Sequence, residues 1–301
     1  MADWQKEISG FKTFLKLEKS LSGNSIEAYI NDVMKLSTFI EIKRLDLAPQ
    51  DIKLSHLKDF IKWFNELGLS ARSQARVISG IRAFYRYLLL EDPIDTDPSS
   101  LLDLRKIGRK LPEVLSVEEI DLLISKIDLS KPEGQRNKAI IEVLYSCGLR
   151  VSELTGLKLS NIYFEQGFIR VVGKGNKERL VPMGSKAIHE VEFYLSDRNR
   201  LPSISKDSED ILFLNRRGHK LTREMVFTII KDLVRKSGIK KNVSPHTFRH
   251  SFATHLIDGG ADLRAVQEML GHESILTTEI YTHLDRQYLR DAIIRFHPRS
   301  E

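Results

Sequence analysis

Four side chains near the end of this chain could do chemistry together. His246, Arg249 and His272 precede Tyr281 in a polar run that is rich in basic groups. Two imidazoles, a guanidinium and a phenol donate hydrogen bonds and move protons, so their natural common target is an anion. His246 and Arg249 are three residues apart and would share one face of a helix. A guanidinium beside an imidazole is costly there unless an anion is expected.

A metal site is the first alternative for a group of histidines. His246 and His250 are four residues apart, but the segment lacks the glutamate of an HExxH metalloprotease. Cys147 is the only cysteine, which excludes a cysteine-rich zinc site. We therefore expect neither a metal nor another cofactor. We interpret His255 and His283 as hydrogen-bonded helix histidines.

The elements that must position these groups include a predicted β-hairpin. Residues 167–183 have a strand pattern around a turn at residues 173–176, with Lys174 at its tip. The glycines lack the GxxxxGK[ST] order of a phosphate-binding loop, so nucleotide hydrolysis has no support. Residues 136–162 predict two helices broken near Gly148, with Cys147 as a small core residue. Further helices are predicted over residues 222–238, 247–260, 263–272 and 287–296.

Prolines and basic residues mark a boundary between two domains. Pro93, Pro98 and Pro112 interrupt the helical pattern, and we place the junction near residue 108. Residues 1–108 carry 16 basic and 15 acidic side chains, whereas residues 109–301 carry 31 and 26. An anionic substrate should therefore be processed in the larger domain. Ser116 and Glu119 form a capping box pattern that predicts a new helix just after the boundary.

Length and composition agree with this division. A chain of 301 residues exceeds the usual single-domain size, and 41% hydrophobic with 29% charged residues is typical of a globular protein. The net charge of +6 and the sequence pI near 9.2 favour an acidic partner such as nucleic acid. No apolar run approaches the roughly 18 residues of a membrane span, and the start lacks a signal-peptide core. We expect a cytoplasmic protein in a reducing compartment, associated with the nucleoid if its acidic partner is DNA.

The first domain is predicted to be a set of short helices. One of them, over residues 70–90, contains four arginines and no acidic residue. Such a helix could lie along DNA phosphates, or its arginines could simply be solvated, and the sequence favours neither interpretation. The basic linker leaves the same two alternatives open. The candidate DNA-binding residues are Arg72, Arg76, Arg82 and Arg86 of the helix and Arg105 and Lys106 of the linker.

An ordered set of motifs resembles the catalytic signature of the tyrosine recombinases, the phage integrase family. Its members are Arg150 in SCGLRVSEL, Lys174 in VVGKGNKERL, His246 and Arg249 in SPHTFRHSFATH, His272 in MLGHESILTT and Tyr281 in IYTHL. Residues 69–92 are similar to the core-binding segment of the family, and the ending RFHPRS resembles the Xer subgroup. The resemblance covers nearly the whole chain. It implies a mainly α protein with a small β-sheet or hairpin, in which residues 1–108 form a helical, SAM-like core-binding domain with the start of the linker. Residues 109–301 would be a mixed α+β catalytic domain with a C-terminal tail that contacts another subunit.

The resemblance also implies a role for each residue. Tyr281 would attack a DNA phosphorus and form a 3′-phosphotyrosyl intermediate. Arg150 and Arg249 would clamp the non-bridging oxygens, and Lys174 would protonate the leaving 5′-oxygen. His246 is assigned to proton transfer and His272 to a hydrogen bond on the phosphate. Glu153 matches an acidic position of the family and could equally orient Arg150.

The implied biological role is the resolution of chromosome or plasmid dimers at a duplex DNA recombination site. The implied partners are further subunits in a homo- or hetero-tetramer on two DNA sites, a related recombinase, and a septal DNA translocase. A mobile-element integrase and a type IB topoisomerase-like enzyme, which relaxes DNA with a similar residue set, are the enzymatic alternatives. A non-catalytic DNA-binding architectural protein is the alternative from another class.

Overall fold

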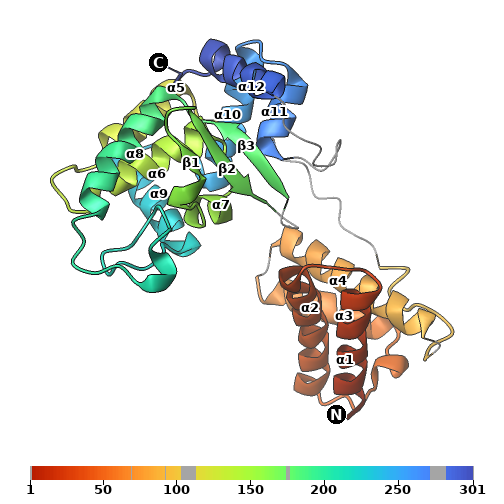
Figure 1. Ribbon diagram of the computed structural model, residues 1–301. Helices are drawn as coiled ribbons and strands as arrows, with labels where there is room; N and C mark the ends of the chain where they lie inside the picture. The colour runs from red at the N-terminus through yellow and green to blue at the C-terminus, as the bar shows by residue number, and fades with distance from the viewer. Residues whose placement is uncertain are drawn as a thin grey trace. The chain divides into compact units, whose positions relative to one another are not determined.

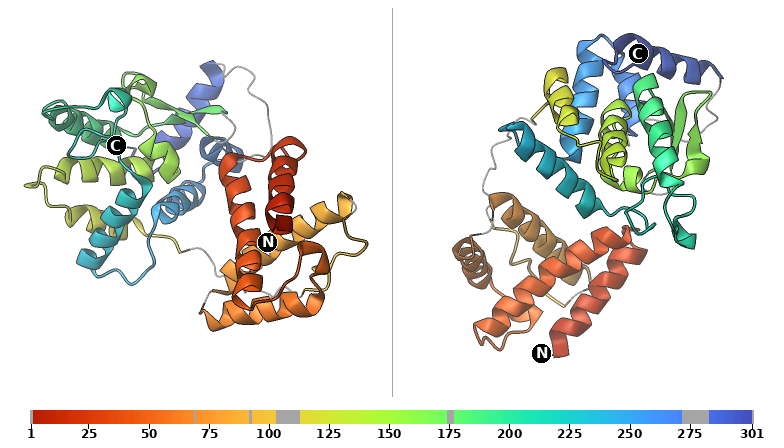
Figure 2. Two further views of the ribbon diagram at one scale, coloured as in Figure 1. Left: turned by 90° about the horizontal axis from the view of Figure 1, so that it is seen from below. Right: turned by 90° about the vertical axis from the view of Figure 1, so that its left-hand side faces the viewer.

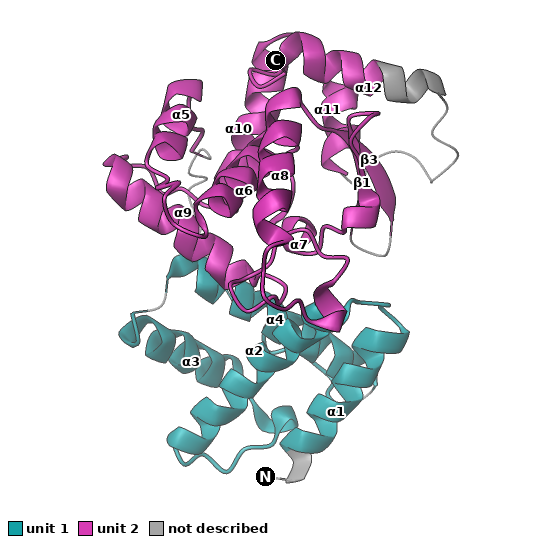
Figure 3. Ribbon diagram, turned by 60° about the vertical axis from the view of Figure 1, so that its left-hand side comes forward, with its two compact units in different colours: residues 1–110 teal, residues 111–301 magenta. Residues whose placement is uncertain are grey.

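The computed structural model describes residues 2–68, 70–91, 93–102, 113–173, 177–271 and 283–300, with the side chains of residues 2, 3 and 283–287 not included. The chain divides into two compact units, Met1–Lys110 (unit 1) and Leu111–Glu301 (unit 2) (Figure 3). The division lies two residues beyond the junction near residue 108 that the prolines indicate. Each unit has a hydrophobic core of its own. In the described part of the chain, no helix is long and apolar enough to cross a membrane.

The described residues of unit 1 contain four α-helices: α1 (Ala2–Leu17), α2 (Gly23–Ile42), α3 (Leu54–Glu66) and α4 (Ala71–Leu90). Helices α1, α2 and α4 pack against one another around buried aromatic side chains, among them Phe11, Phe39 and Phe84. Helices α2 and α4 approach closely at Gly80, where an added Cβ would lie 2.7 Å from the Asp32 Cβ. The helices predicted from the apolar spacing of this region are confirmed.

Unit 2 begins with α5 (Val117–Ser125), and the capping box predicted for it is confirmed. The Ser116 backbone N–H donates to Glu119 Oε2 at 2.8 Å, and the Glu119 N–H donates to Ser116 Oγ at 3.3 Å. The other helices of this unit are α6 (Gly134–Ser146), α7 (Val151–Thr155), α8 (Ser185–Arg198), α9 (Arg223–Ser237), α10 (Pro245–Asp258), α11 (Leu263–Leu270) and α12 (His283–Phe296). Short 3-10 turns lie at Pro49–Asp51 in unit 1 and at Leu159–Asn161 and Lys206–Ser208 in unit 2.

The predicted hairpin is confirmed as part of a three-stranded antiparallel sheet in the order β1-β2-β3. Strand β2 (Phe168–Val172) pairs with β3 (Glu178–Pro182), so that Val172 faces Glu178 at the hairpin end. Strand β1 (Ile162–Tyr163) pairs with the other edge of β2. Strand β3 packs against α11 and α12, which lie beside it in Figure 1 and in the left-hand view of Figure 2. Through this contact the hairpin packs against α11, the helix that precedes Tyr281 in the sequence.

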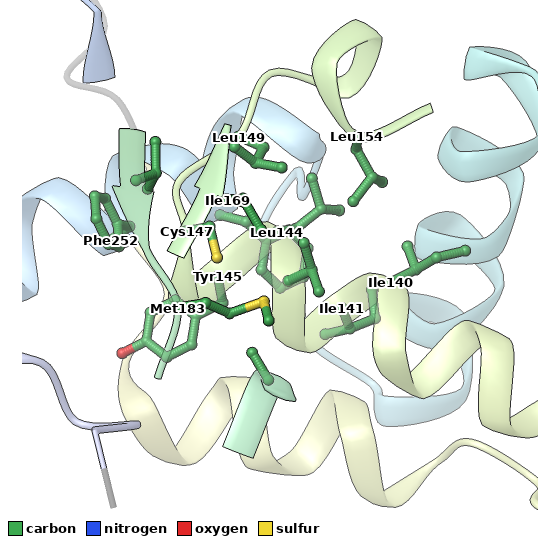
Figure 4. Close-up of a cluster of buried hydrophobic side chains, with 14 of the residues drawn as sticks. Ile140, Ile141, Leu144, Tyr145, Cys147, Leu149, Leu154, Ile169, Met183 and Phe252 are labelled. Carbon is green, nitrogen blue, oxygen red and sulfur yellow. The ribbon is translucent and has the colours of Figure 1, made fainter. Parts of the chain in front are cut away.

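Helix α6 lies in the centre of the unit 2 core. Cys147 and Leu149, just after α6, pack together with Phe252 of α10 and Met183 beyond β3 (Figure 4). Cys147 is fully buried, as predicted. Helix α8, to which the sequence analysis assigned no structure, packs along α6.

Candidate active site

The site is built around two arginines of unit 2 that lie far apart in the sequence, Arg150 and Arg249. Arg150 is the N-cap of α7, and its backbone N–H donates to Glu153 Oε2 at 2.8 Å. Its side chain donates to Glu153 Oε1 at 2.8 Å and to the Gly271 carbonyl at 3.3 Å. Arg249 is on α10, where its Nη1 donates to the Gly148 carbonyl at 2.8 Å and its Nη2 donates to the Leu270 carbonyl. The structure thus brings the two predicted phosphate ligands to adjacent carbonyls at the end of α11.

A third arginine, which the sequence analysis missed, joins this group. Arg179 of β3 is buried, and its Nη1 and Nη2 donate to the two oxygens of Glu153 at 2.8 Å each. Its Nε donates to the Met269 carbonyl at 2.7 Å. The only local signal would have been the strand alternation, which places Arg179 on the same face as the apolar Val181. The carbonyls of three consecutive residues therefore accept hydrogen bonds from three arginines.

The end of α11 explains why these cations can lie close together without DNA. The last carbonyls of a helix are unpaired and carry the negative end of the helix dipole, which stabilises cations by about 0.3–1 kcal/mol each. Helix α11 ends at Gly271, whose φ of 64° is the left-handed conformation that glycine adopts readily. This turn directs the carbonyls of Met269, Leu270 and Gly271 to the arginines.

The three arginines carry the same charge, but their acceptors compensate that charge to different extents. Burial alone would raise the pKa of Glu153, but hydrogen bonds from Arg179 and Arg150 outweigh it and hold the pKa below its ordinary value. Arg249 donates to neutral carbonyls only, and burial together with the nearby charge of Arg150 lowers its pKa to about 10. It is still protonated at neutral pH. Arg249 therefore presents a buried positive charge that an anion would stabilise.

The other predicted catalytic residues are placed less completely. His246 is exposed in the first turn of α10, one turn before the buried Arg249. Lys174, His272 and Tyr281 lie outside the described residues. The residues that directly precede two of them are described, and both lie against Arg179. An added Cβ would be 3.6 Å from Arg179 Nη1 at Gly173 and 3.0 Å from Arg179 Cδ at Gly271.

His255 has the structural role that we predicted for it. Its Nδ1 lies 2.6 Å from the hydroxyl of Tyr145, which is within hydrogen-bond distance. The same role was predicted for His283, whose side chain is outside those that the structure describes. Where side chains are described, no group of three or more histidine, cysteine or acidic residues could hold a metal ion.

The candidate DNA-binding arginines of α4 fall into two pairs. Arg72 and Arg86 are exposed, as is Arg76. Arg76 forms an ion pair of 2.7 Å with the buried Asp32, and Arg82 donates to the Leu102 carbonyl at 2.5 Å. The second pair therefore has partners within unit 1. Arg105 and Lys106 of the linker lie outside the described residues.

Comparison with known proteins identifies a protein family for both units. Residues 113–288 match the Phage integrase family, and residues 8–92 match its N-terminal SAM-like domain. Tyrosine recombinase XerD of Chlorobaculum tepidum is 44% identical over 303 residues, which are 99% of this chain and 98% of that protein. These matches confirm the predicted fold class.

Two solved structures are similar over most of the chain. One is a site-specific recombinase, XerH, in a post-cleavage complex with a palindromic difH substrate; it is 27% identical with a TM-score of 0.68, and the match covers 95% of this chain and 84% of that one. The other is the Tn1549 transposon integrase in complex with circular intermediate DNA, at 22% identity and a TM-score of 0.72 over 93% of this chain and 97% of that one. The second similarity concerns the fold alone.

Proposed function

Since the chain belongs to the phage integrase family and is a tyrosine-type site-specific DNA recombinase, we propose that it cuts and rejoins duplex DNA through a 3′-phosphotyrosyl intermediate. Tyr281 is the nucleophile in this proposal. The observation that carries it is the convergence of Arg150 and Arg249 at the end of α11, where Arg249 forms no direct ion pair with a described carboxylate. Two guanidinium groups in this arrangement suit a phosphate whose negative charge increases in the transition state.

The proposed chemistry needs neither a metal nor a nucleotide. A phenol with an ordinary pKa near 10 is a weak nucleophile at neutral pH, so nearby cations and a base must favour its phenolate. His246 is proposed to accept the Tyr281 proton, and Lys174 to donate a proton to the departing 5′-oxygen. His272 donates a hydrogen bond to the phosphate. Because the phosphotyrosyl ester conserves the energy of the broken bond, the 5′-hydroxyl of another strand can reverse the step.

The proposed biological role is the resolution of chromosome or plasmid dimers. Its support is the similarity to XerD proteins over nearly the whole chain, together with XerH, whose structure contains a difH substrate. In this role four subunits act on two DNA sites, either as a homo-tetramer or with a related recombinase. A septal DNA translocase is a further proposed partner.

A covalent capture experiment tests the chemistry. The protein is incubated with sheared, nicked genomic DNA of its own organism, and DNA that stays attached in SDS is sequenced. We expect enrichment of a small number of sites, and a nicked oligonucleotide built on such a site should trap a covalent adduct. Tyr281→Phe should form no adduct, whereas Tyr163→Phe, which changes a partly exposed tyrosine on β1, should react like the wild type.

The outcomes separate the alternatives. An adduct that survives Tyr281→Phe, or no adduct with the wild type, would contradict the proposed nucleophile. Relaxation of a supercoiled plasmid without exchange between two copies of the captured site would indicate a topoisomerase. Capture of sites at the ends of a mobile element would indicate an integrase.

A further inference from the structure

We infer that Arg179 is a positioning residue that keeps the charge of Arg150 available for the DNA phosphate, acting through their shared partner Glu153. This inference rests on the proposed function. Arg179 lies on β3, opposite Val171 of β2, and is 5% exposed, so it is not placed to contact DNA itself. Its role follows from its contacts with neighbouring residues.

The carboxylate of Glu153 is saturated by four hydrogen bonds. Oε1 accepts from the side chains of both Arg150 and Arg179, and Oε2 accepts from Arg179 and from the Arg150 backbone, each at 2.8 Å. A carboxylate held in this way cannot turn to pair with one arginine alone. Arg179 is in turn fixed by its bond to the Met269 carbonyl, so β3, α7 and α11 hold one another through it.

The net charge of Arg150, Arg179 and Glu153 together determines how strongly they can attract a phosphate. Two guanidinium groups and one carboxylate carry one net positive charge, which a phosphate can use. If Arg179 were neutral, Glu153 would compensate Arg150 fully, and the pair would carry no net charge. Glu153 and Arg179 are buried, so Coulomb interactions between them are stronger than in water, whereas the Arg150 side chain is 36% exposed and solvent reduces the difference there. Of the arginines that the structure describes in the site, only Arg249 would then offer a charge without a direct ion-pair partner.

Lysine could not replace Arg179 fully. Its compact ammonium group can carry the charge, but it lacks the planar fork that meets both oxygens of Glu153 while a third nitrogen reaches the Met269 carbonyl. The structure thus gives a physical reason for an arginine at this position.

The test compares Arg179→Met with the double variant Glu153→Gln/Arg179→Met. The rate of covalent adduct formation is measured at saturating concentrations of the nicked oligonucleotide. Arg179→Met should be slower than the wild type by on the order of 10²-fold, as for the loss of one oxyanion ligand. Adding Glu153→Gln removes the carboxylate that neutralises Arg150, so the double variant should recover at least about tenfold of that loss. DNA binding in a gel-shift assay should change little.

A second substrate separates positioning from general destabilisation. A methylphosphonate at the cleaved position lacks one charged non-bridging oxygen, so it depends less on a positioned arginine. On it, the deficit of Arg179→Met should shrink by about tenfold. The matched control is Arg198→Met, which removes another buried arginine whose side chain donates to the Ile211 and Glu209 carbonyls. This variant should lower the melting temperature but show equal rate effects on the two substrates.

Three results would overturn the inference: equal deficits of Arg179→Met on both substrates, a wild-type rate for that variant, or a double variant slower than the single one. If Arg179→Met does not fold, the double variant still decides, because a neutral pair often tolerates burial. It should then cleave within about tenfold of the wild type, and a loss of about 10²-fold or more would contradict the inference. Failure of the proposed function itself would be visible separately, as the absence of an adduct with the wild-type protein.

Discussion

Four arginines of unit 2, three of them buried, show how the acceptor determines what a charged side chain can do. Arg150 and Arg179 share the carboxylate of Glu153, Arg249 donates to carbonyls at the ends of two helices, and Arg198 donates to carbonyls of a loop. Burial is similar for Arg179, Arg198 and Arg249. Only the group at the end of α11 brings several positive charges together. We therefore base the site on this convergence and not on burial.

One histidine should make the stability of unit 2 dependent on pH. Burial lowers the pKa of His297 to about 3, well below its ordinary value of 6.5. The folded protein therefore holds the neutral imidazole, whereas the unfolded chain takes up a proton below pH 6.5. Stability should fall as the pH decreases from 6.5 toward 3, and between pH 8 and pH 5 the loss due to this group is about 2 kcal/mol.

Urea unfolding at pH 8 and pH 5 measures this effect. His297→Phe keeps an aromatic ring beside Tyr145 and Phe252 and should lose about 2 kcal/mol less than the wild type over this range. His219→Gln changes an exposed histidine and should follow the wild type. Equal pH dependence of His297→Phe and the wild type would contradict the assigned pKa.

At the scale of elements, two glycine turns create the cation cluster. Gly148 separates α6 from α7 with a φ of 56°, and its carbonyl accepts from Arg249. Gly271 ends α11 with a φ of 64°, and its carbonyl accepts from Arg150. Both turns require a conformation that residues with a Cβ rarely adopt. The positions of the two clamping arginines therefore depend on these breaks in helical structure.

Gly148→Ala should lower the stability of unit 2 more than Gly238→Ala does. An added Cβ at Gly148 would lie 2.5 Å from the Phe252 ring, so the variant combines a strained φ with overpacking, and we expect a loss of about 3–5 kcal/mol. Gly238→Ala is the control, because Gly238 has a φ of 74° with no atom within 4 Å of the added Cβ. It should lose only about 1–2 kcal/mol. Chemical denaturation measures the free energy of unfolding of both variants. Equal losses would show that Phe252 moves freely.

At the scale of the whole molecule, the two units divide the work of binding and chemistry in our proposal. Each has its own core, and the arginine cluster belongs to unit 2 alone. Unit 1 contributes the arginines of α4, which are not equivalent. Arg76 and Arg86 are both exposed, but Arg76 also pairs with Asp32, which is 2% exposed, whereas no ion pair of Arg86 is found among the described residues. We therefore expect a substitution of Arg86 to affect DNA binding and a substitution of Arg76 to affect the stability of unit 1.

Arg86→Gln and Arg76→Gln test this separation. If Arg86 contacts a phosphate, Arg86→Gln should reduce the slope of log affinity against log salt by about 0.9, because one fewer counterion is released, and leave unfolding unchanged. Arg76→Gln should destabilise unit 1 by about 1–3 kcal/mol, because the buried Asp32 loses one of its two charged partners and keeps only Lys35. Filter binding at several salt concentrations and thermal unfolding measure the two effects. An unchanged slope for Arg86→Gln would place Arg86 away from the DNA backbone.

Local patterns in the sequence predicted most of the elements. The capping box at Ser116, the break at Gly148 and the hairpin of residues 167–183 depend on residues a few positions apart, and all three are confirmed. Helix α8 was missed, although Val191, Tyr194 and Leu195 follow a helical spacing, because this pattern is short and mixed with charged residues. The ordered motifs also led to the family, which the similarity to known recombinases confirms.

By itself, the sequence determined the fold class, the family and the residue types of the site, because these depend on local periodicity and on motif order. Only the tertiary structure decided which arginines share a carboxylate and which retain their charge. Arg150 meets Gly271 across 121 positions, and Arg179 meets Met269 across 90. Hydrogen bonds and burial at such separations depend on how strands and helices pack, and no local pattern around Arg179 records that packing.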